Sequence, residues 1–323
     1  MLAYFASLKP IALWNAVPGG VAQGLIWGIM ALGVYLTFRM LDVADLTVDG
    51  SFATGGAVCI MWVLNGGNPE LALIMAFLAG LLAGFVTGLL HTRLGIPAIL
   101  AGILTQISLY SINLVIMGKA NQAVNVTKVS FLFTSNAKFL PRTIGITAAL
   151  GIAIIAILYW YLGTEHGSAL RATGINGNMA RAQGINTDRM KVIGLALSNG
   201  FVALSGAVLS QYQGFADVNM GRGAIVIGLA AVIIGEVLRQ AFFGKKISLW
   251  LTLLFVVVGS IIYYLVYVFV LWLKFPADLM KLLTAIVVAI FLAVPYLQNQ
   301  RKTSFRHLAR ENAKADKEAG KNA

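Results

Sequence analysis

Charged residues are scarce in this chain of 323 residues, because Asp, Glu, Lys and Arg together make up only 11% of it. Soluble domains carry about 25% charged residues. The chain is also 59% hydrophobic, with a mean hydropathy of +0.83. These values exclude a soluble single-chain enzyme and predict a membrane protein, since little of the chain is left for a domain that faces water.

Residues that build catalytic and metal sites are also rare. Cys59 is the single cysteine, which excludes an internal disulfide and a zinc site built from cysteines. The histidines, His91, His166 and His307, are too far apart in the sequence to form a ligand pattern. No Gly-Lys pair is followed by Ser or Thr, so the sequence contains no phosphate-binding loop. We therefore expect no catalytic residue, metal or cofactor on this chain, and any ATP and Mg²⁺ to be bound by a partner.

The chain instead has long apolar stretches. Most have the ~17–25 residues that a spanning helix needs, although the second, seventh and ninth are short. Outside their boundary residues they contain no Asp, Glu, Lys, Arg or His, which argues against a proton-driven carrier but leaves sodium coupling through backbone carbonyls open. The sequence thus predicts an all-α, polytopic membrane protein with about nine transmembrane helices. The stretches are residues 13–38, 50–64, 71–90, 94–117, 143–162, 192–213, 223–238, 247–273 and 282–297.

The basic residues predict the orientation. The net charge is +12, and most of the 24 Lys and Arg residues fall on the cytoplasmic side if the N-terminus is outside and the C-terminus inside. We expect a transmembrane domain over residues 1–298 and a basic cytoplasmic tail over residues 299–323, which lies near anionic lipid headgroups and not on nucleic acid. The N-terminal residues lack the features of a cleavable signal peptide, so we expect them to stay on the protein.

The second and seventh stretches are short and rich in glycine. Short, glycine-interrupted segments at matching places in two halves indicate broken helices that line a substrate path. An odd number of crossings separates the two stretches, so they run in opposite directions, as an inverted repeat requires. The alternative is that glycine is simply common in membrane helices. The glycines are Gly50, Gly55 and Gly56 in the second stretch and Gly223, Gly228 and Gly235 in the seventh.

Uncharged polar residues occur in the fourth and sixth stretches, where they predict a path lined by hydrogen-bonding groups. Such a lining suits a solute that must not bind tightly, whereas the alternative is hydrogen bonding between helices, worth roughly 0.6–2 kcal/mol for each bond. The candidate path residues, taken together with those at the starts of the two short stretches, are Asp49, Gly50, Ser51, Gln106, Asn113, Asn199, Gln211, Gly223 and Gly228.

An acidic run, Asp42, Asp45 and Asp49, comes between the first and second stretches. It is compatible with a functional ion site. We favour a capped and solvated helix start, because Asp is a good N-cap and a carboxylate complements the positive end of a helix.

The longest central loop on the cytoplasmic side covers residues 163–191. It has no proline and carries evenly spaced arginines, and its middle can form a short helix along the membrane face. The tripeptide Gly-Ile-Asn occurs in it twice, at residues 174–176 and 184–186. By itself the composition also fits a solvated loop whose arginines fix the topology.

Several blocks of the sequence resemble one family. Residues 170–174 (LRATG), 180–186 (ARAQGIN) and 203–207 (ALSGA) look like the coupling region of ABC importer permeases, in the group that includes branched-chain amino acid, ribose and nucleoside permeases. Residues 45–51 (DLTVDGS) resemble that group's broken second helix, and residues 221–225 (GRGAI) resemble its later counterpart. These blocks come in the order that the family has.

The resemblance implies a permease subunit in the cell membrane that is not itself an enzyme. Two copies, as a homodimer, would form the path, two cytoplasmic ATPases would receive the coupling helices, and an extracellular or periplasmic binding protein would deliver the solute. The sequence departs from the family at Asn178, where members often have Glu, which affects the ion-pair partner on the ATPase. The ATPase-coupling residues implied are Arg171, Gly174, Asn176, Ala180, Gly184 and Asn186.

The expected solute is an aromatic or related amino acid, because residues 45–52 (DLTVDGSF) resemble permeases paired with binding proteins of the tryptophan and tyrosine type. Branched-chain amino acids, nucleosides and sugars stay open. The polar outside loop of residues 118–141 would contact the binding protein or cover the path. The alternative functions are an ion-coupled secondary transporter that uses the same broken helices, and an integral membrane enzyme, for which the sequence offers no nucleophile or acid–base pair.

Overall fold

The computed structural model describes residues 10–124, 131–136, 138–244 and 248–273, together with the single positions 282, 285, 286, 289 and 293. The chain divides into two compact units, Met1–Phe275 and Pro276–Ala323. In the second unit the five described positions are helical. The rest of the ninth predicted stretch and the whole basic tail lie outside the described residues, so the fold below is that of the first unit.

Eight helices in the described residues are long and apolar enough to span a membrane. They match the first eight predicted stretches to within a few residues, which confirms an all-α, polytopic membrane protein. Helices suit this setting because all of their backbone groups are paired within the segment. The helices are α2 (Pro10–Tyr35), extended by the π-helix η1 (Leu36–Met40), α3 (Thr47–Leu64), α4 (Pro69–Thr92), α5 (Ala98–Met117), α6 (Leu140–Gly163), α9 (Thr187–Gln213), α10 (Ala224–Phe243) and α11 (Leu249–Trp272).

Two short helices and two short strands join these helices. Two short helices, α7 (Glu165–Ile175) and α8 (Gly177–Ala182), lie between α6 and α9. Among the described residues there are also two short strands, β1 (Asn121–Ala123) and β2 (Phe215–Asp217), which pair antiparallel. The sequence did not predict these strands. They tie the loop after α5 to the end of α9.

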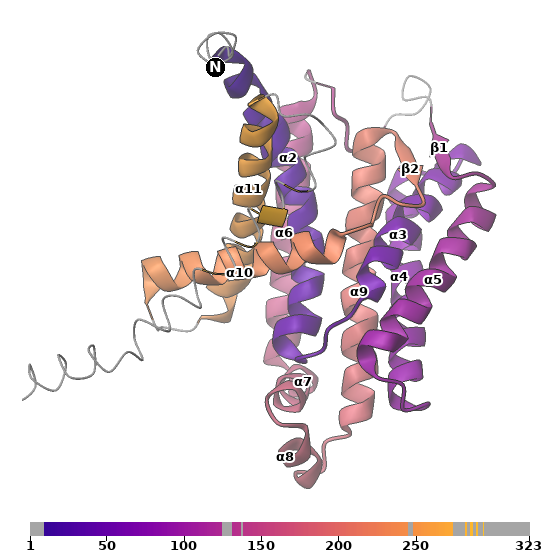
Figure 1. The fold of residues 1–323 in the computed structure, drawn as a ribbon, viewed down its shortest axis with the longest axis vertical. Helices are drawn as coiled ribbons and strands as arrows, with labels where there is room; N and C mark the ends of the chain where they lie inside the picture. The colour runs from indigo at the N-terminus through magenta and orange to yellow at the C-terminus, as the bar shows by residue number, and fades with distance from the viewer. Residues whose placement is uncertain are drawn as a thin grey trace, which may run out of the picture. The chain divides into compact units, whose positions relative to one another are not determined.

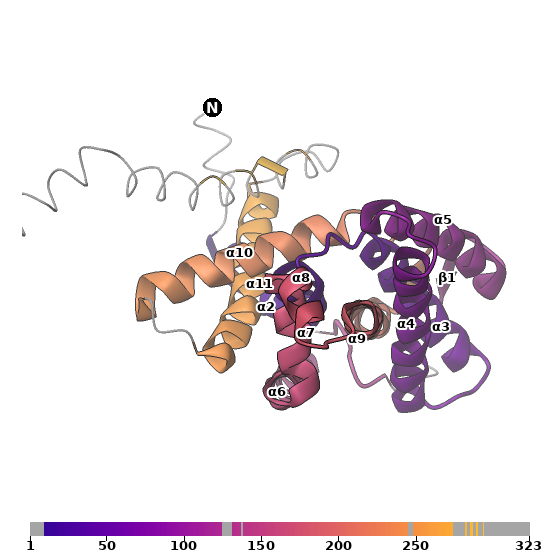
Figure 2. The same ribbon diagram turned by 90° about the horizontal axis from the view of Figure 1, so that it is seen from below.

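α9 forms the centre of the first unit. It packs along α4, α3 and α2, while α2 packs in turn on α11, α10 and α6. Figures 1 and 2 show α9 between α2 on one side and the group of α3, α4 and α5 on the other. The outer helices expose apolar side chains such as Leu82, Ile107 and Trp160, as helices that face lipid do.

α10 is placed differently from the other long helices. Figures 1 and 2 both show it lengthwise, so it lies across the directions of α2 and α9. The prediction that the second and seventh stretches run in opposite directions is therefore wrong for α10, which lies crosswise. Its length and composition are nevertheless those of a spanning helix. The physical reason is that Asp49 bonds the start of α10 and Arg39 pairs with Glu236 in its second half.

Glycines let the central helices touch through their backbones. A methyl group at Gly55 of α3 would collide with the carbonyl oxygen of Ala203 in α9, and one at Gly80 of α4 would collide with that of Asn199. α3 is a continuous helix from Thr47 to Leu64, so the second stretch is not broken at its glycines as predicted. These glycines serve close packing, and the chain is broken before α3, where residues 41–46 are not helical.

Candidate translocation site and coupling segment

The first turn of α3 meets the start of α10, although the two are far apart in the sequence. The Asp49 carboxylate accepts hydrogen bonds from the backbone N–H groups of Gly223 (2.9 Å) and Ile225 (3.0 Å). Gly223 has a φ of +85°, which glycine adopts readily. The first N–H groups of a helix have no partner within it, and a carboxylate satisfies them and complements the positive end of the helix. Asp49 therefore fixes the position at which α10 begins.

A cavity of about 260 Å³ lies beside this junction, between α3, α5 and the segment that joins β2 to α10. Four of the predicted path residues line it, namely Asp49, Gly50, Gln106 and Asn113. The other lining residues are Ile107, Tyr110, Val218 and Arg222. The sequence analysis did not select these four for the path. The helical spacing of Gln106, Tyr110 and Asn113, four and then three residues apart, is the signal that finds Tyr110.

Two side chains at the cavity have unused hydrogen-bonding groups. Asn113 is 0% exposed, and neither atom of its side-chain amide has a partner among the described residues. Leaving such a group unsatisfied costs about 1–3 kcal/mol, so a buried free amide indicates a bound polar molecule or water. Arg222 is exposed, and its guanidinium forms no ion pair or hydrogen bond with the part of the chain that the structure describes.

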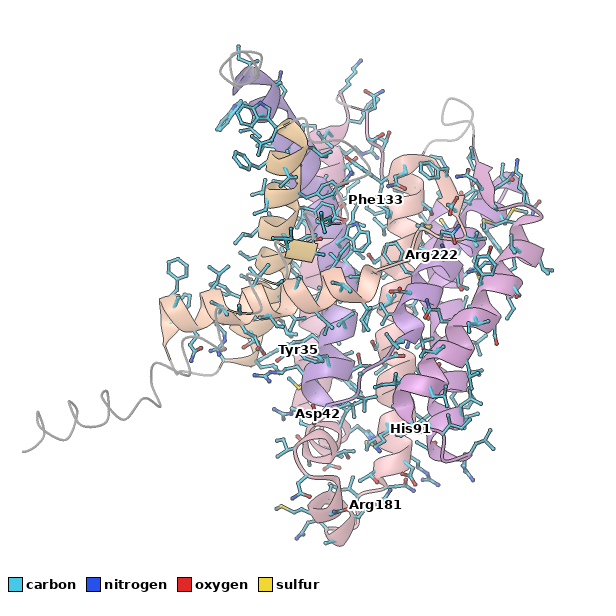
Figure 3. All side chains as sticks on the ribbon, in the orientation of Figure 1. Tyr35, Asp42, His91, Phe133, Arg181 and Arg222 are labelled. Atoms are coloured by element: carbon cyan, nitrogen blue, oxygen red, sulfur yellow. The ribbon has the colours of Figure 1, made fainter. Side chains whose placement is uncertain are left out.

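Arg222 lies well away from the basic residues of α7, α8 and the turns beside them, which are called the coupling segment after the role that the resemblance implies. Figure 3 shows Asp42, His91 and Arg181 toward one end of the first unit, Phe133 toward the other, and Arg222 between them. The positive charge of Arg222 is therefore placed within the length of the bundle, beside the cavity.

A buried polar network lies next to the cavity and holds α3 against α9. The Asp45 carboxylate, only 2% exposed, accepts hydrogen bonds from Thr47 N (2.9 Å) and Asn199 Nδ2 (2.6 Å). The Ser51 hydroxyl donates to Asn199 Oδ1 (2.6 Å). The N-cap residue of α3 is Leu46, and Asp45, one position earlier, bonds the first N–H group of the helix. The expectation that this carboxylate is solvated is wrong, because Asn199 of α9 contacts it. Ser51 and Asn199 belong to this network and do not line the cavity.

Two other predicted path residues lie elsewhere. Gln211 is buried and donates from Nε2 to the carbonyl oxygen of Pro69 (2.8 Å), which ties the end of α9 to the start of α4. Gly228 of α10 packs against Val34 of α2, where a methyl group would be crowded. The structure gives both residues packing roles, which is the alternative that the sequence analysis kept open.

The repeated Gly-Ile-Asn tripeptide marks two helix starts in the coupling segment. The side chain of Asn176 accepts a hydrogen bond from Met179 N (3.0 Å) at the start of α8. Asn186 does the same with Arg189 N (3.0 Å) at the start of α9. Asn is a preferred N-cap because its side-chain oxygen satisfies an N–H group that the helix leaves open. Each asparagine thus ends one turn and begins the next helix.

The remaining predicted coupling residues shape the same segment. Gly174 packs on the backbone of Met40, and Gly184 has a φ of +81° in the turn after α8. Ala180 is buried, and the Arg171 Nη2 atom donates to Ser168 Oγ at 3.2 Å. The structure therefore brings all six predicted residues into one segment, which consists of α7, α8 and the turns beside them.

Two exposed apolar side chains in this segment escaped the sequence analysis. Ile175 is 86% exposed and Met179 is 63% exposed. Arg181 fixes α8 to the start of α9 by donating to Thr187 Oγ1 (2.6 Å) and Asp188 Oδ1 (2.9 Å). The two apolar side chains are therefore presented on a segment that is anchored to the central helix.

The second half of α10 is bound to η1, which α7 of the coupling segment contacts. Arg39, in η1, forms an ion pair with Glu236 of α10 (2.7 Å). Asp49 holds the start of α10, and Arg39 contacts its later part. One helix therefore connects the cavity with the end of α2, on which Gly174 of the coupling segment packs through Met40.

Comparisons with known proteins identify relatives of this chain. The family model described as "Branched-chain amino acid transport system / permease component" matches residues 17–292. The chain is similar to the tyrosine transport system permease protein of Clostridioides difficile (strain R20291), with 39% identity over 92% of this chain and 97% of that protein. It is also similar to the autoinducer 2 import system permease protein LsrC of Escherichia coli (strain K12 / DH10B), with 29% identity over 67% of this chain and 61% of that protein.

A solved structure, PsaBC from Streptococcus pneumoniae in complex with Fab, matches 91% of this chain and 95% of its own chain, with a TM-score of 0.49 and 16% identity. That likeness is too distant to carry an argument. The family match, by contrast, spans most of the chain, and the chain contains eight helices of spanning type in its described part. The chain is a multi-pass membrane protein and belongs to the branched-chain amino acid transport system permease component family, the ABC importer permease group that its sequence resembles.

Proposed function

We propose that this chain is the membrane-spanning subunit of an ATP-driven importer and that its solute passes through the cavity beside Asp49. The observation that carries the proposal is the cavity between α3, α5 and the start of α10, which is lined by the unpartnered amide of Asn113. A transport path needs polar groups that are available to the solute, and buried amides are otherwise nearly always satisfied. Membership of the family supports the transport role.

The coupling segment is the proposed docking site for a separate cytoplasmic ATPase, which would bind ATP and Mg²⁺. Ile175 and Met179 are exposed on a short helical segment whose neighbours are polar. Exposed apolar side chains of this kind suit a pocket on a partner. Arg181 keeps the segment attached to α9, so movement of the ATPase would be transmitted to the central helix.

A second copy of the chain is the proposed partner along α5. The exposed face of this helix mixes Ser108, Tyr110 and Ser111 with apolar residues. A face that meets only lipid does not need hydroxyl groups, whereas helix–helix interfaces in membranes are enriched in serine. The cavity is lined by α5, so a second copy placed there would close it from the side. This arrangement supports a homodimer.

The proposed solute is an aromatic amino acid, tyrosine or tryptophan, delivered by an external binding protein. The similarity to a tyrosine transport permease supports this assignment. The outside loop supports contact with the binding protein, because Ala120 accepts a hydrogen bond from Val218 N (3.0 Å), and Val218 lines the cavity. A protein bound to this loop would sit next to the cavity wall.

The orientation proposed from the basic residues places the coupling segment and the C-terminus in the cytoplasm. The turns after η1 and α4 and the coupling segment lie toward one end of the first unit in Figure 1, as that orientation requires. The tail after residue 298 would lie near anionic lipid headgroups.

Uptake by the reconstituted complex tests the proposed function. Proteoliposomes would contain this chain and its partner ATPase, with the partner binding protein added outside. We expect uptake of radiolabelled tyrosine that requires ATP inside and stops when either partner is left out. Uptake by this chain alone under a sodium gradient would contradict the proposal and favour an ion-coupled secondary transporter.

A further inference from the structure

We propose that the cavity binds a zwitterionic α-amino acid, with Arg222 facing its carboxylate and Asp49 facing its ammonium group. This inference rests on the proposed function, since it takes the cavity to be the place through which the solute passes. It goes further because it assigns recognition to this chain as well as to the binding protein, and because it separates amino acids from neutral sugars and nucleosides.

Charged side chains of both signs line the cavity. Of the lining residues in the described part of the chain, Asp49 is negative and Arg222 is positive, and they form no ion pair with each other. Burying a charge without a partner is costly. A neutral solute that covers Arg222, which is otherwise exposed, would leave its guanidinium without a counter-ion and would leave Asp49 with only the positive end of α10, whereas a zwitterion supplies an opposite charge for each.

Asp49 and Arg222 both have hydrogen-bonding capacity left for a solute. Each Asp49 oxygen accepts one backbone N–H group of α10. An ionised carboxylate has about four acceptor sites, so capacity for an ammonium group remains. The Arg222 guanidinium is uncommitted within the described residues, and its planar group binds a carboxylate through two parallel hydrogen bonds.

Asn113 has a buried side-chain amide that a polar solute can bind. Its amide offers both donors and an acceptor, and none is used by the described chain. Asn113 is seven residues along α5 from Gln106, so the two amides lie on the same face of the helix as the ring of Tyr110. A polar solute in the cavity would satisfy the Asn113 amide, which a purely apolar molecule would leave unsatisfied.

The volume of the cavity and its apolar lining determine which solute side chain it accommodates best. The cavity volume of about 260 Å³ lies below the roughly 300–1,000 Å³ of drug-sized ligand sites, so it suits one amino acid and not a peptide. Ile107, Tyr110 and Val218 form its apolar part. An aromatic side chain gains most from such a wall, because a second ring can pack against Tyr110.

Binding to the importer without its binding protein tests the inference. The complex of this chain with its ATPase, in nanodiscs, would be titrated with radiolabelled tyrosine by scintillation proximity. The competitors are tyramine, which lacks the carboxylate, 3-(4-hydroxyphenyl)propanoate, which lacks the ammonium group, and ribose, which is neutral. We expect both tyrosine analogues to compete at least about tenfold more weakly than tyrosine, since each loses a charge-assisted hydrogen bond, and ribose not to compete.

Substitution of the two charged residues should change this selectivity in opposite ways. Arg222→Gln should weaken tyrosine binding about tenfold and leave tyramine binding unchanged, and Arg222→Lys should restore part of the preference. Asp49→Asn should remove the preference for tyrosine over the propanoate. Arg142→Gln, at an exposed arginine at the start of α6 that does not line the cavity, is the matched control and should change nothing.

The outcomes separate this inference from the proposed function. The inference is wrong if Arg222→Gln keeps the full preference for tyrosine over tyramine, if ribose competes, or if vesicles import tyrosine while the nanodisc complex binds none. In that last case the proposed function stands. Tyrosine binding with the expected selectivity, but without ATP-dependent uptake, would support the site and contradict the proposed importer.

Discussion

Single residues show how this protein accommodates an acid within an apolar bundle. Asp45 comes from a non-helical segment and lies against the middle of α9, where Asn199 contacts both Asp45 and Ser51. The sequence predicted the capping role of this acidic run from residue type alone. It could not predict the burial of Asp45, because the partner that covers it is 154 residues away in the chain.

Asn199→Ala should lower the free energy of unfolding by about 1.5–3 kcal/mol, because it removes a hydrogen bond to a buried carboxylate. Asn199→Asp should be at least as damaging, since it places two acids side by side. Heating the detergent-purified variants and measuring the monodisperse fraction by size exclusion checks this. Asn178→Ala is the matched control, since that asparagine side chain is exposed. Wild-type melting of Asn199→Ala would contradict the role given to the network.

At the scale of elements, the contact of α4 and α9 depends on glycine. Gly80 and Gly84 each face a carbonyl oxygen of α9 so closely that a methyl group does not fit. Gly151 of α6 is also helical, yet no atom of the described residues lies within 4 Å of the place its methyl group would take. Composition alone does not separate these two kinds of glycine, because the neighbouring helix decides which is needed.

Gly80→Ala should destabilise the protein by about 1–3 kcal/mol, because an overpacked contact forces the helices apart. Gly151→Ala should stabilise it by about 0.5–1 kcal/mol, since alanine loses less backbone entropy in a helix. Thermal unfolding of the two variants, measured in the same detergent, compares them directly. Equal effects of both substitutions on stability would show that the close approach of α4 and α9 does not stabilise the protein.

The coupling segment gives a second prediction at this scale. Ile175→Gln should abolish copurification of the ATPase without changing the melting temperature, because the side chain is almost fully exposed. Leu94→Gln, at an exposed apolar residue outside α7 and α8, should leave copurification intact. Retention of the ATPase by Ile175→Gln would place the docking surface elsewhere.

Asn186→Ala tests the structural reading of the repeated tripeptide. It should cost about 1 kcal/mol of stability through loss of the N-cap of α9, and Asn186→Asp should restore it, because aspartate caps a helix equally well. The measurement is again the melting temperature. Failure of Asp to restore stability would mean that Asn186 does more than cap the helix.

For the whole molecule, hydropathy predicted most of the fold and little of the site. The long apolar helices follow from composition, because the bilayer allows few alternatives. The crosswise placement of α10 does not, since it depends on contacts made by Asp49 and Arg39. For the same reason the sequence selected Asn113 and Gln106 but not Arg222, whose nearness to the cavity depends on the turn that precedes α10.

The orientation can be tested by thiol labelling in whole cells. The native Cys59 is buried, so Cys59→Ala gives a background without reactive thiol. Lys119→Cys should react with a membrane-impermeant maleimide from outside, and Asn178→Cys should react only after permeabilisation. Both positions are exposed, and Figure 1 shows β1, which follows Lys119, and α8, which contains Asn178, toward opposite ends of the first unit. The reverse pattern would invert the topology proposed from the basic residues.

The bond between Asp45 and Asn199 also has a consequence for the order in which the protein is made. Asn199 leaves the ribosome 154 residues after Asp45, a delay of about 8–30 s at ~5–20 residues per second. β1 must likewise wait for β2. Until α9 is inserted, the Asp45 carboxylate before α3 lacks the amide of Asn199, and the wall that Val218 and Arg222 contribute does not exist. The cavity is therefore completed late in synthesis, after the first five spanning helices have been made.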